Sequence, residues 1–105
     1  MGNVSTKVGM RAIKTTRHFD KWMAGLRDRQ AVARIRIRID RLALGNPGQV
    51  RNLKAGVCEL KVDYGPGYRV YFTERDGLVV ILLCGGTKQK QDDDIAFAQR
   101  LAKEI

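Results

Sequence analysis

The sequence has few of the residues from which metal sites and nucleophilic sites are built. Among its 105 residues there is one histidine, His18, and there are two cysteines, Cys58 and Cys84. Both cysteines lie in apolar, strand-like segments, at a spacing that does not suit zinc. A single histidine, in the first turn of an expected helix, does not build a Ser-His-Asp triad. We therefore expect no metal and no other cofactor, and two buried free thiols, as in a reducing compartment.

Long apolar runs are also missing. The longest, residues 78–84, suits one buried strand, whereas a membrane span needs about 20 apolar residues. The first residues contain no apolar signal core. The sequence predicts a single domain, residues 1–105, in the cytoplasm and without a membrane partner. Residues 1–9 have little pattern and are expected to form a flexible tail, so that either Met1 or Met10 would serve as the native start.

Acidic residues are scarce in the first half of the chain. Residues 1–54 hold 13 Lys/Arg and 3 Asp/Glu, whereas residues 55–105 hold 7 and 8. The whole chain carries a formal charge of +9. Such a distribution predicts a polyanion or an acidic protein as partner. The alternative is a basic helix surface that only contacts solvent.

The most informative stretch is ELKVDYGPGYRVYF, residues 59–72. Apolar and polar residues alternate on both sides of a Gly-Pro-Gly turn, which is typical of two half-buried strands. One face of these strands is expected to pack on the core. The other face would then present Lys61, Arg69 and Tyr71 to solvent or to a negatively charged ligand.

Two helices are expected in the first half. Thr16 is a good N-cap, and the apolar residues that follow it share one helical face as far as residues 27–29. The run from Arg34 to Ile39 alternates like a strand, but over residues 30–44 the apolar positions follow a helical period. We interpret the two segments as an antiparallel helix pair.

The remaining pattern predicts an α+β domain. Strands are expected at residues 10–14, 57–63, 68–74 and 78–84, and a final helix at residues 92–103. The fold class predicted is a mostly antiparallel four-stranded sheet, with the N-terminal helix pair packed on one face and a short C-terminal helix.

A cluster of cations is the candidate site. If the strands pair in sequence order, Lys61, Arg69 and Tyr71 converge with Lys88, which follows the last strand. We predict that these four residues are catalytic. Other cations are predicted to bind RNA: Arg51, Lys54 and Lys90.

The cluster suits RNA, because Arg and Lys bind phosphate and Tyr can stack on a base. Cleavage by a ribose 2′-hydroxyl needs a base, cations that stabilise the phosphorane and an acid for the leaving oxygen. A lysine crowded by other cations would have to be the base. From the residues alone, binding without catalysis remains the alternative.

An apolar stripe lies between the arginines of the second helix. Ala33, Ile37 and Leu44 project away from the expected buried face. Such a stripe indicates a protein partner, although isolated exposed apolar residues are also common.

Several blocks resemble one family. They are Phe19-Asp20-Lys21-Trp22, Arg38-Ile39-Asp40-Arg41-Leu42, GPGYRVYF at residues 65–72, and LLCGG at residues 82–86 with Lys88 and Gln91-Asp92. Together they resemble the RelE/ParE superfamily of toxins from bacterial type II toxin–antitoxin modules. The nearest branch is that of the HigB-like, phage-derived addiction-module killers. The resemblance covers residues 10–102.

The resemblance implies a microbial RNase-like fold and a toxin that cleaves messenger RNA on the ribosome. It also implies a cognate antitoxin, a small helix-turn-helix protein, which we expect at Ala33, Ile37 and Leu44. The arginine of the family's GYR motif falls on Arg69, and a strand cation falls on Lys61. Glu59 stands where a second cation is expected. The alternative within the superfamily is a ParE-type toxin that inhibits DNA gyrase and cleaves nothing.

Overall fold

The computed structural model describes residues 10–105, so the expected tail at residues 1–9 lies outside the described residues. In this part of the chain the elements are, in order, β1 (Ala12–Thr15), α2 (Arg17–Ala24), α3 (Arg29–Ala43), β2 (Val50–Asn52), β3 (Cys58–Val62), β4 (Tyr68–Arg75), β5 (Val79–Thr87), a 3-10 turn η1 (Lys88–Lys90) and α4 (Gln91–Glu104). The α+β class predicted from the sequence is confirmed.

The sheet is mixed and five-stranded, in the order β1-β5-β4-β3-β2. The prediction of four strands is wrong because β2 pairs with β3 through Val50 and Leu60. The three residues of β2 are polar or half-buried, and a segment this short shows no alternation that could predict a strand. Three of the four ladders are antiparallel, and β1 runs parallel to β5.

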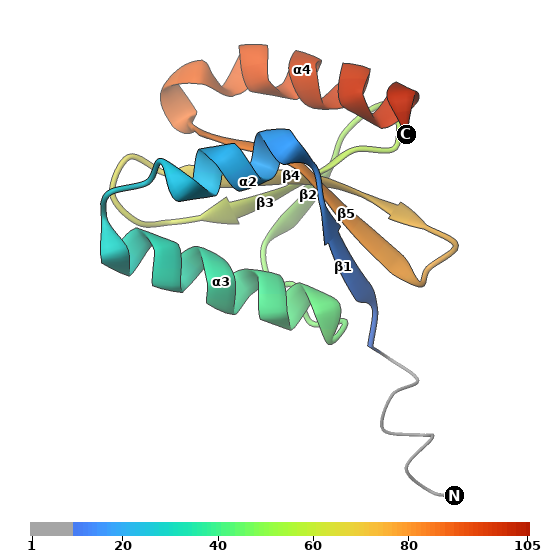
Figure 1. Cartoon of the computed structure of the whole chain (residues 1–105), viewed down its shortest axis with the longest axis horizontal. Helices are drawn as coiled ribbons and strands as arrows, with labels where there is room; N and C mark the ends of the chain where they lie inside the picture. The colour runs from blue at the N-terminus through green and yellow to red at the C-terminus, as the bar shows by residue number, and fades with distance from the viewer. Residues whose placement is uncertain (1–9) are drawn as a thin grey trace, which may run out of the picture.

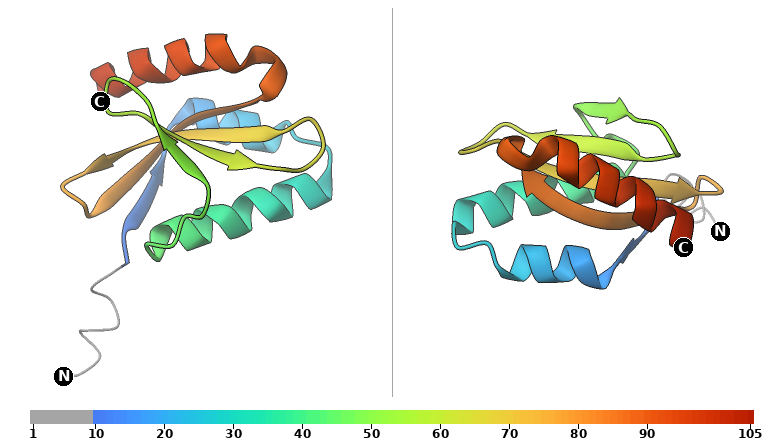
Figure 2. Two further views of the ribbon diagram at one scale, coloured as in Figure 1. Left: turned by 180° about the vertical axis from the view of Figure 1, so that it is seen from behind. Right: turned by 90° about the horizontal axis from the view of Figure 1, so that it is seen from above.

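Helices cover both faces of the sheet. Phe19 of α2 and Ile35 of α3 pack with Leu60 and Phe72 on one face, and Ala98 and Leu101 of α4 pack on the other face. Figures 1 and 2 show the sheet between these two layers. The expectation of an open, solvent-facing side on β3 and β4 is therefore wrong. The predicted helix pair also needs correction, since α2 and α3 contact β5 and β3 more than they contact each other.

The helix α2 begins where its cap predicts. The Thr16 hydroxyl accepts a hydrogen bond from the Phe19 N–H at 3.1 Å and donates to the Leu83 carbonyl of β5. One side chain thus satisfies an N–H of the first turn and joins the helix to the sheet. The helix ends at Ala24, before the predicted residues 27–29.

Replacing Thr16 with alanine removes both hydrogen bonds, and we expect the free energy of unfolding to fall by about 1–2 kcal/mol. Equilibrium unfolding in urea measures this change. Thr16→Ser is the matched control, because serine keeps the hydroxyl. An alanine variant as stable as the serine variant would contradict the role of the cap.

The helix α3 confirms the helical interpretation of the Arg/Ile run. Asp28 caps it by accepting from the N–H groups of Gln30 and Ala31 at 2.9 and 3.2 Å. Ile35 and Leu42 are buried against the sheet. The strand-like alternation therefore arises from arginines that stand between isoleucines on different sides of a helix, with Ile35 buried and Ile37 exposed.

A bulge in β5 sets the direction of its side chains. Tyr71 pairs with Cys84 and Phe72 pairs with Leu82, so Leu83 is the extra residue. Leu83 and Cys84 consequently both belong to the core beneath α4. The two cysteines are free, as expected from the sequence, but only Cys84 is buried and Cys58 is half-buried. Burial raises the pKa of the Cys84 thiol to about 12.

Candidate functional site

Polar side chains line a cleft of about 430 Å³ on the α4 side of the sheet, next to the edge strand β2. Its lining comes from the segment before β2, from β2, β3 and β4, and from the first residue of α4: Gln49, Val50, Arg51, Glu59, Lys61, Arg69 and Gln91. Arg51, Lys61 and Arg69 bring three positive charges into this cleft.

Strand register explains why these residues meet. Lys61 lies opposite Arg69, and Glu59 lies opposite Tyr71 on the β3–β4 ladder. Glu59 also lies opposite Arg51 on the β2–β3 ladder. Because alternate residues of a strand share a face, all five side chains lie on the side of the sheet that α4 covers. The predicted convergence of Lys61 and Arg69 is confirmed.

Glu59 is the centre of the polar contacts in the cleft, and only 4% of its surface is exposed. Its Oε1 lies 3.1 Å from Nη2 of Arg51. Its Oε2 accepts from the Tyr71 hydroxyl at 3.1 Å and from Gln91 Nε2 at 2.9 Å. The same oxygen lies 3.6 Å from Arg69 Nε. The buried carboxylate is thus held by two cations and two neutral donors.

Arg69 is 5% exposed, and its Nη1 donates to the Gly67 carbonyl at 3.0 Å. Its Nε, also buried, has no hydrogen-bond partner among the described residues. Gly67 has a φ of +81°, and a Cβ there would lie 3.3 Å from Arg69 Nη1. The second glycine of the Gly-Pro-Gly turn therefore allows both the turn and the position of the guanidinium.

Tyr71 is fully buried, which contradicts the expectation that its ring faces solvent. Burial raises the pKa of its hydroxyl, and the adjacent charge of Glu59 raises it further. The neutral phenol donates to Glu59 and holds that carboxylate in place. Tyr71 thus holds the Glu59 side chain of the cleft in position, and its buried ring is not accessible for stacking by a base.

Lys61 lies at the open side of the cleft, where its Nζ is 3.4 Å from Asp63 Oδ1. Its ammonium group is thus paired with a carboxylate, although Arg69 lies opposite Lys61 on the neighbouring strand. The backbone carbonyl of Lys61 accepts a hydrogen bond from Arg38 Nη1 of α3. Arg38 also donates to the carbonyls of Pro47 and Gln49, so α3 fixes β3 to the segment that leads into β2.

The remaining predicted cations lie at different places. Lys88 and Lys90 are exposed on η1 and line a second hollow, which meets the cleft at Gln91. The N–H of Lys88 donates to the Gly67 carbonyl at 3.0 Å, the same oxygen that Arg69 contacts. Lys54 does not line the cleft, and its carbonyl accepts from Gln99 farther along α4.

Glu59 and Gln91 are among the residues of the cleft that sequence reasoning missed. Gln91 begins α4, and only the placement of that helix brings it to Glu59. By sequence alone, Glu59 is a departure from a family pattern. Glu59 is two residues from Lys61, however, and this spacing puts both side chains on the same face of the strand. The sequence contained a signal for this position. Glu59 is a carboxylate between apolar neighbours on a predicted strand, and it shares a face of that strand with a lysine.

The apolar stripe of α3 is exposed, as the helical period predicted. Ile37 and Leu44 are 50% and 60% exposed, and Ala33 is exposed with them. Arg34 and Arg41 flank Ile37 around a shallow hollow. The exposure is confirmed, and the partner stays a prediction.

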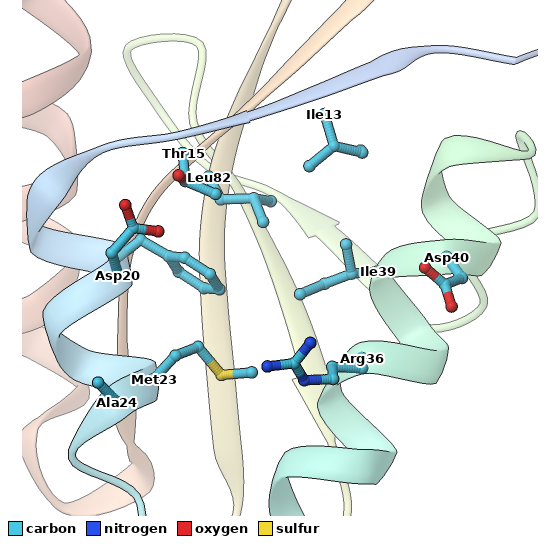
Figure 3. A pocket seen from close by; sticks show the side chains of 10 residues that line it. Ile13, Thr15, Asp20, Met23, Ala24, Arg36, Ile39, Asp40 and Leu82 are labelled. Atoms are coloured by element: carbon cyan, nitrogen blue, oxygen red, sulfur yellow. The ribbon is translucent and has the colours of Figure 1, made fainter.

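A larger groove of about 470 Å³ lies between α2 and α3 on the opposite face of the sheet. In Figure 3 the apolar side chains of Met23, Ile39 and Leu82 point into it, and Asp20 and Asp40 lie on its two sides. Among the described residues that line it, Arg36 is the one cation. The smaller cleft is the better candidate for anion chemistry because its cations converge.

Two further properties hold for residues 10–105. No group of three or more His, Cys, Asp or Glu side chains in this range could hold a metal ion. No helix in the same range has the length and apolar character needed to cross a membrane.

Comparison with known proteins identifies a relative of the chain. No family model matches the chain. An uncharacterized protein of Haemophilus influenzae is 48% identical over 93 residues, which span 89% of this chain and 94% of that protein. Identity at this level over nearly the full length of both proteins establishes common descent. The chain therefore belongs to the same protein family as this Haemophilus influenzae protein.

Proposed function

We propose that the chain is the toxin of a type II toxin–antitoxin module, of RelE/ParE type, and that it cleaves messenger RNA on the ribosome. One observation carries this proposal: Arg51, Lys61 and Arg69 line one cleft, where Arg51 and Arg69 face a buried anion, the Glu59 carboxylate. Guanidinium and ammonium groups in this arrangement match a phosphodiester. The net charge of +9 would draw the chain to RNA in the bacterial cytoplasm.

The cleft, together with Lys88 of the adjoining hollow, supplies the groups for transesterification at phosphorus. The 2′-oxygen of the ribose attacks the adjacent phosphorus, and the bond from phosphorus to the 5′-oxygen breaks. Arg69 and Lys61 stabilise the charge that develops on the phosphorane. Glu59, the one carboxylate in the cleft lining, takes the proton of the 2′-hydroxyl. Lys88 gives a proton to the leaving 5′-oxygen.

The absence of a histidine from the cleft lining supports the proposed dependence on the ribosome. His18 packs its ring against Phe97 with 5.0 Å between the ring centroids, on the α2–α4 contact. No histidine therefore lies among the residues that line the cleft. Without a histidine, proton transfer would be slow on free RNA, and alignment of the substrate on the ribosome would compensate for it.

Primer extension on cellular messenger RNA after induction of the chain tests this function. New 5′ ends within coding regions are expected, at positions that depend on translation. The alternative is a gyrase inhibitor without nuclease activity, which the missing histidine favours. Intact messenger RNA combined with loss of supercoiling by purified gyrase would replace our proposal with that alternative.

The antitoxin is proposed to be a small helix-turn-helix protein that covers the stripe of Ala33, Ile37 and Leu44. Replacing Ile37 with aspartate puts a charge into that contact, and we expect the complex to weaken about tenfold or more. Isothermal titration calorimetry with the cognate antitoxin measures the change. Leu78→Asp is the matched control, because Leu78 is equally apolar and exposed but lies in the β4–β5 turn. Equal affinities of the Ile37→Asp variant and the original chain would refute this surface.

A further inference from the structure

The Glu59 carboxylate lies where the anion of a ligand would lie. Arg51 and Arg69, the two guanidinium groups of the cleft, both face it, at 3.1 and 3.6 Å. Carboxylate and phosphate present similar pairs of oxygens to a guanidinium. In the ligand-free chain, the cations that would bind phosphate are therefore partly neutralised by an internal anion.

The contact between Glu59 and Arg69 is poor. The separation of 3.6 Å between Arg69 Nε and Glu59 Oε2 is too long for a charge-assisted hydrogen bond. The buried Nε has no other partner among the described residues. An unpaired buried donor costs free energy, so a ligand oxygen that reaches this N–H gains a contact that Glu59 does not make.

Glu59 would keep two hydrogen bonds after a ligand replaced it on the arginines. The Tyr71 hydroxyl and the Gln91 amide both donate to Glu59, and neither is charged. A carboxylate that loses its two guanidinium partners would keep these hydrogen bonds. Arg51, with 59% of its side chain exposed, can turn toward a ligand without disturbing the core.

We propose that a phosphate group of single-stranded RNA takes the place of the Glu59 carboxylate on Arg51 and Arg69. Glu59 thereby lowers the affinity of the free chain for RNA, and the exchange frees its Oε1 from Arg51. This inference rests on the proposed function for its ligand, and it concerns binding rather than cleavage.

The Glu59→Gln variant tests the exchange. Glutamine keeps an acceptor for Tyr71 and Gln91 and removes the competing charge. Fluorescence anisotropy with a short, labelled 2′-O-methyl RNA, which cannot be cleaved by 2′-hydroxyl attack, measures the affinity. We expect binding to tighten about tenfold, the difference between a charged and a neutral hydrogen-bond partner. Unchanged or weaker binding would overturn the proposal.

The matched control is Glu74→Gln on β4. It removes the same charge from a carboxylate that pairs with Arg11 outside the cleft. An affinity change of less than about twofold is expected, because exposed charges are screened. A gain as large as that of Glu59→Gln would show an effect of net charge alone and would overturn the exchange.

A second measurement uses the unaltered chain and does not depend on how the variant folds. The ¹⁵N–¹H resonance of Arg69 Nε, assigned with Arg69→Lys, should shift when the 2′-O-methyl RNA is added. Inorganic phosphate should move the same resonance at higher concentration if phosphate alone suffices. An Arg69 Nε resonance that stays fixed while RNA binds would overturn the exchange. The two proposals can fail separately. If the Glu59→Gln variant binds RNA more tightly but the original chain cleaves no RNA, the proposed exchange is supported and the proposed endonuclease activity is overturned.

Discussion

Replacing Arg69 with alanine should abolish growth arrest and lower the rate of messenger RNA cleavage by about 100- to 1000-fold, the usual loss when one donor to a developing oxyanion is removed. The guanidinium is held by the Gly67 carbonyl and faces the interior of the cleft. Alanine leaves no cation at this position, and Lys61, which also pairs with Asp63, cannot replace it.

Folding should survive this substitution. Glu59 keeps Arg51, Tyr71 and Gln91 as partners, so the buried carboxylate is not left alone. We expect the free energy of unfolding to fall by about 1–3 kcal/mol, mainly because a charged partner is lost. Thermal unfolding measured alongside cleavage separates the two effects.

Arg75→Ala is the control for Arg69→Ala. Arg75 ends the same strand but is exposed and lies outside the cleft. It should leave cleavage and growth arrest unchanged. A fully toxic and folded Arg69→Ala variant would show that Arg69 has no part in the activity.

Replacing Gly85 with alanine should give a large loss of stability. A Cβ at this position would overlap the six-membered ring of the Trp22 indole, which packs against the core on the α2 face. An indole is rigid and is held by Phe19 and Tyr68, so α2 would have to move from the sheet. We expect a loss of about 2–3 kcal/mol in the free energy of unfolding, as for other overpacked cores.

Gly86→Ala is the matched control in the next residue. A Cβ there would overlap the carboxyl group of Asp94 on the other face. Burial raises the pKa of Asp94, so its side chain gains hydration when it rotates outward. A loss below about 1 kcal/mol is expected. If urea unfolding showed equal losses for both variants, the close approach of α2 would not explain Gly85.

Local sequence patterns predicted much of the fold. A cap and a helical period were enough to place α2 and α3, and strand alternation was enough for β3 and β4. The strand β2 was missed because three residues have no readable period. The parallel pairing of β1 depends on contacts far apart in the sequence, which local pattern does not encode.

The candidate site shows the same division. Pairing of Lys61 with Arg69 follows from a short turn between two strands, and it was predicted. Burial of Tyr71 was not predicted, because α4 has a weak apolar face made of residues such as Ala98 and Leu101. Once α4 covers that side of the sheet, Glu59 changes from a surface residue to the buried partner of two arginines.

The most direct test of the account is made with purified components. The chain is added to ribosomes programmed with a messenger RNA of defined sequence, with and without the antitoxin. We predict cleavage at the ribosome that needs Arg69, leaves a 2′,3′-cyclic phosphate and a 5′-hydroxyl, and stops when the antitoxin is present. Intact messenger RNA on ribosomes at a concentration of the chain that arrests growth would contradict the account.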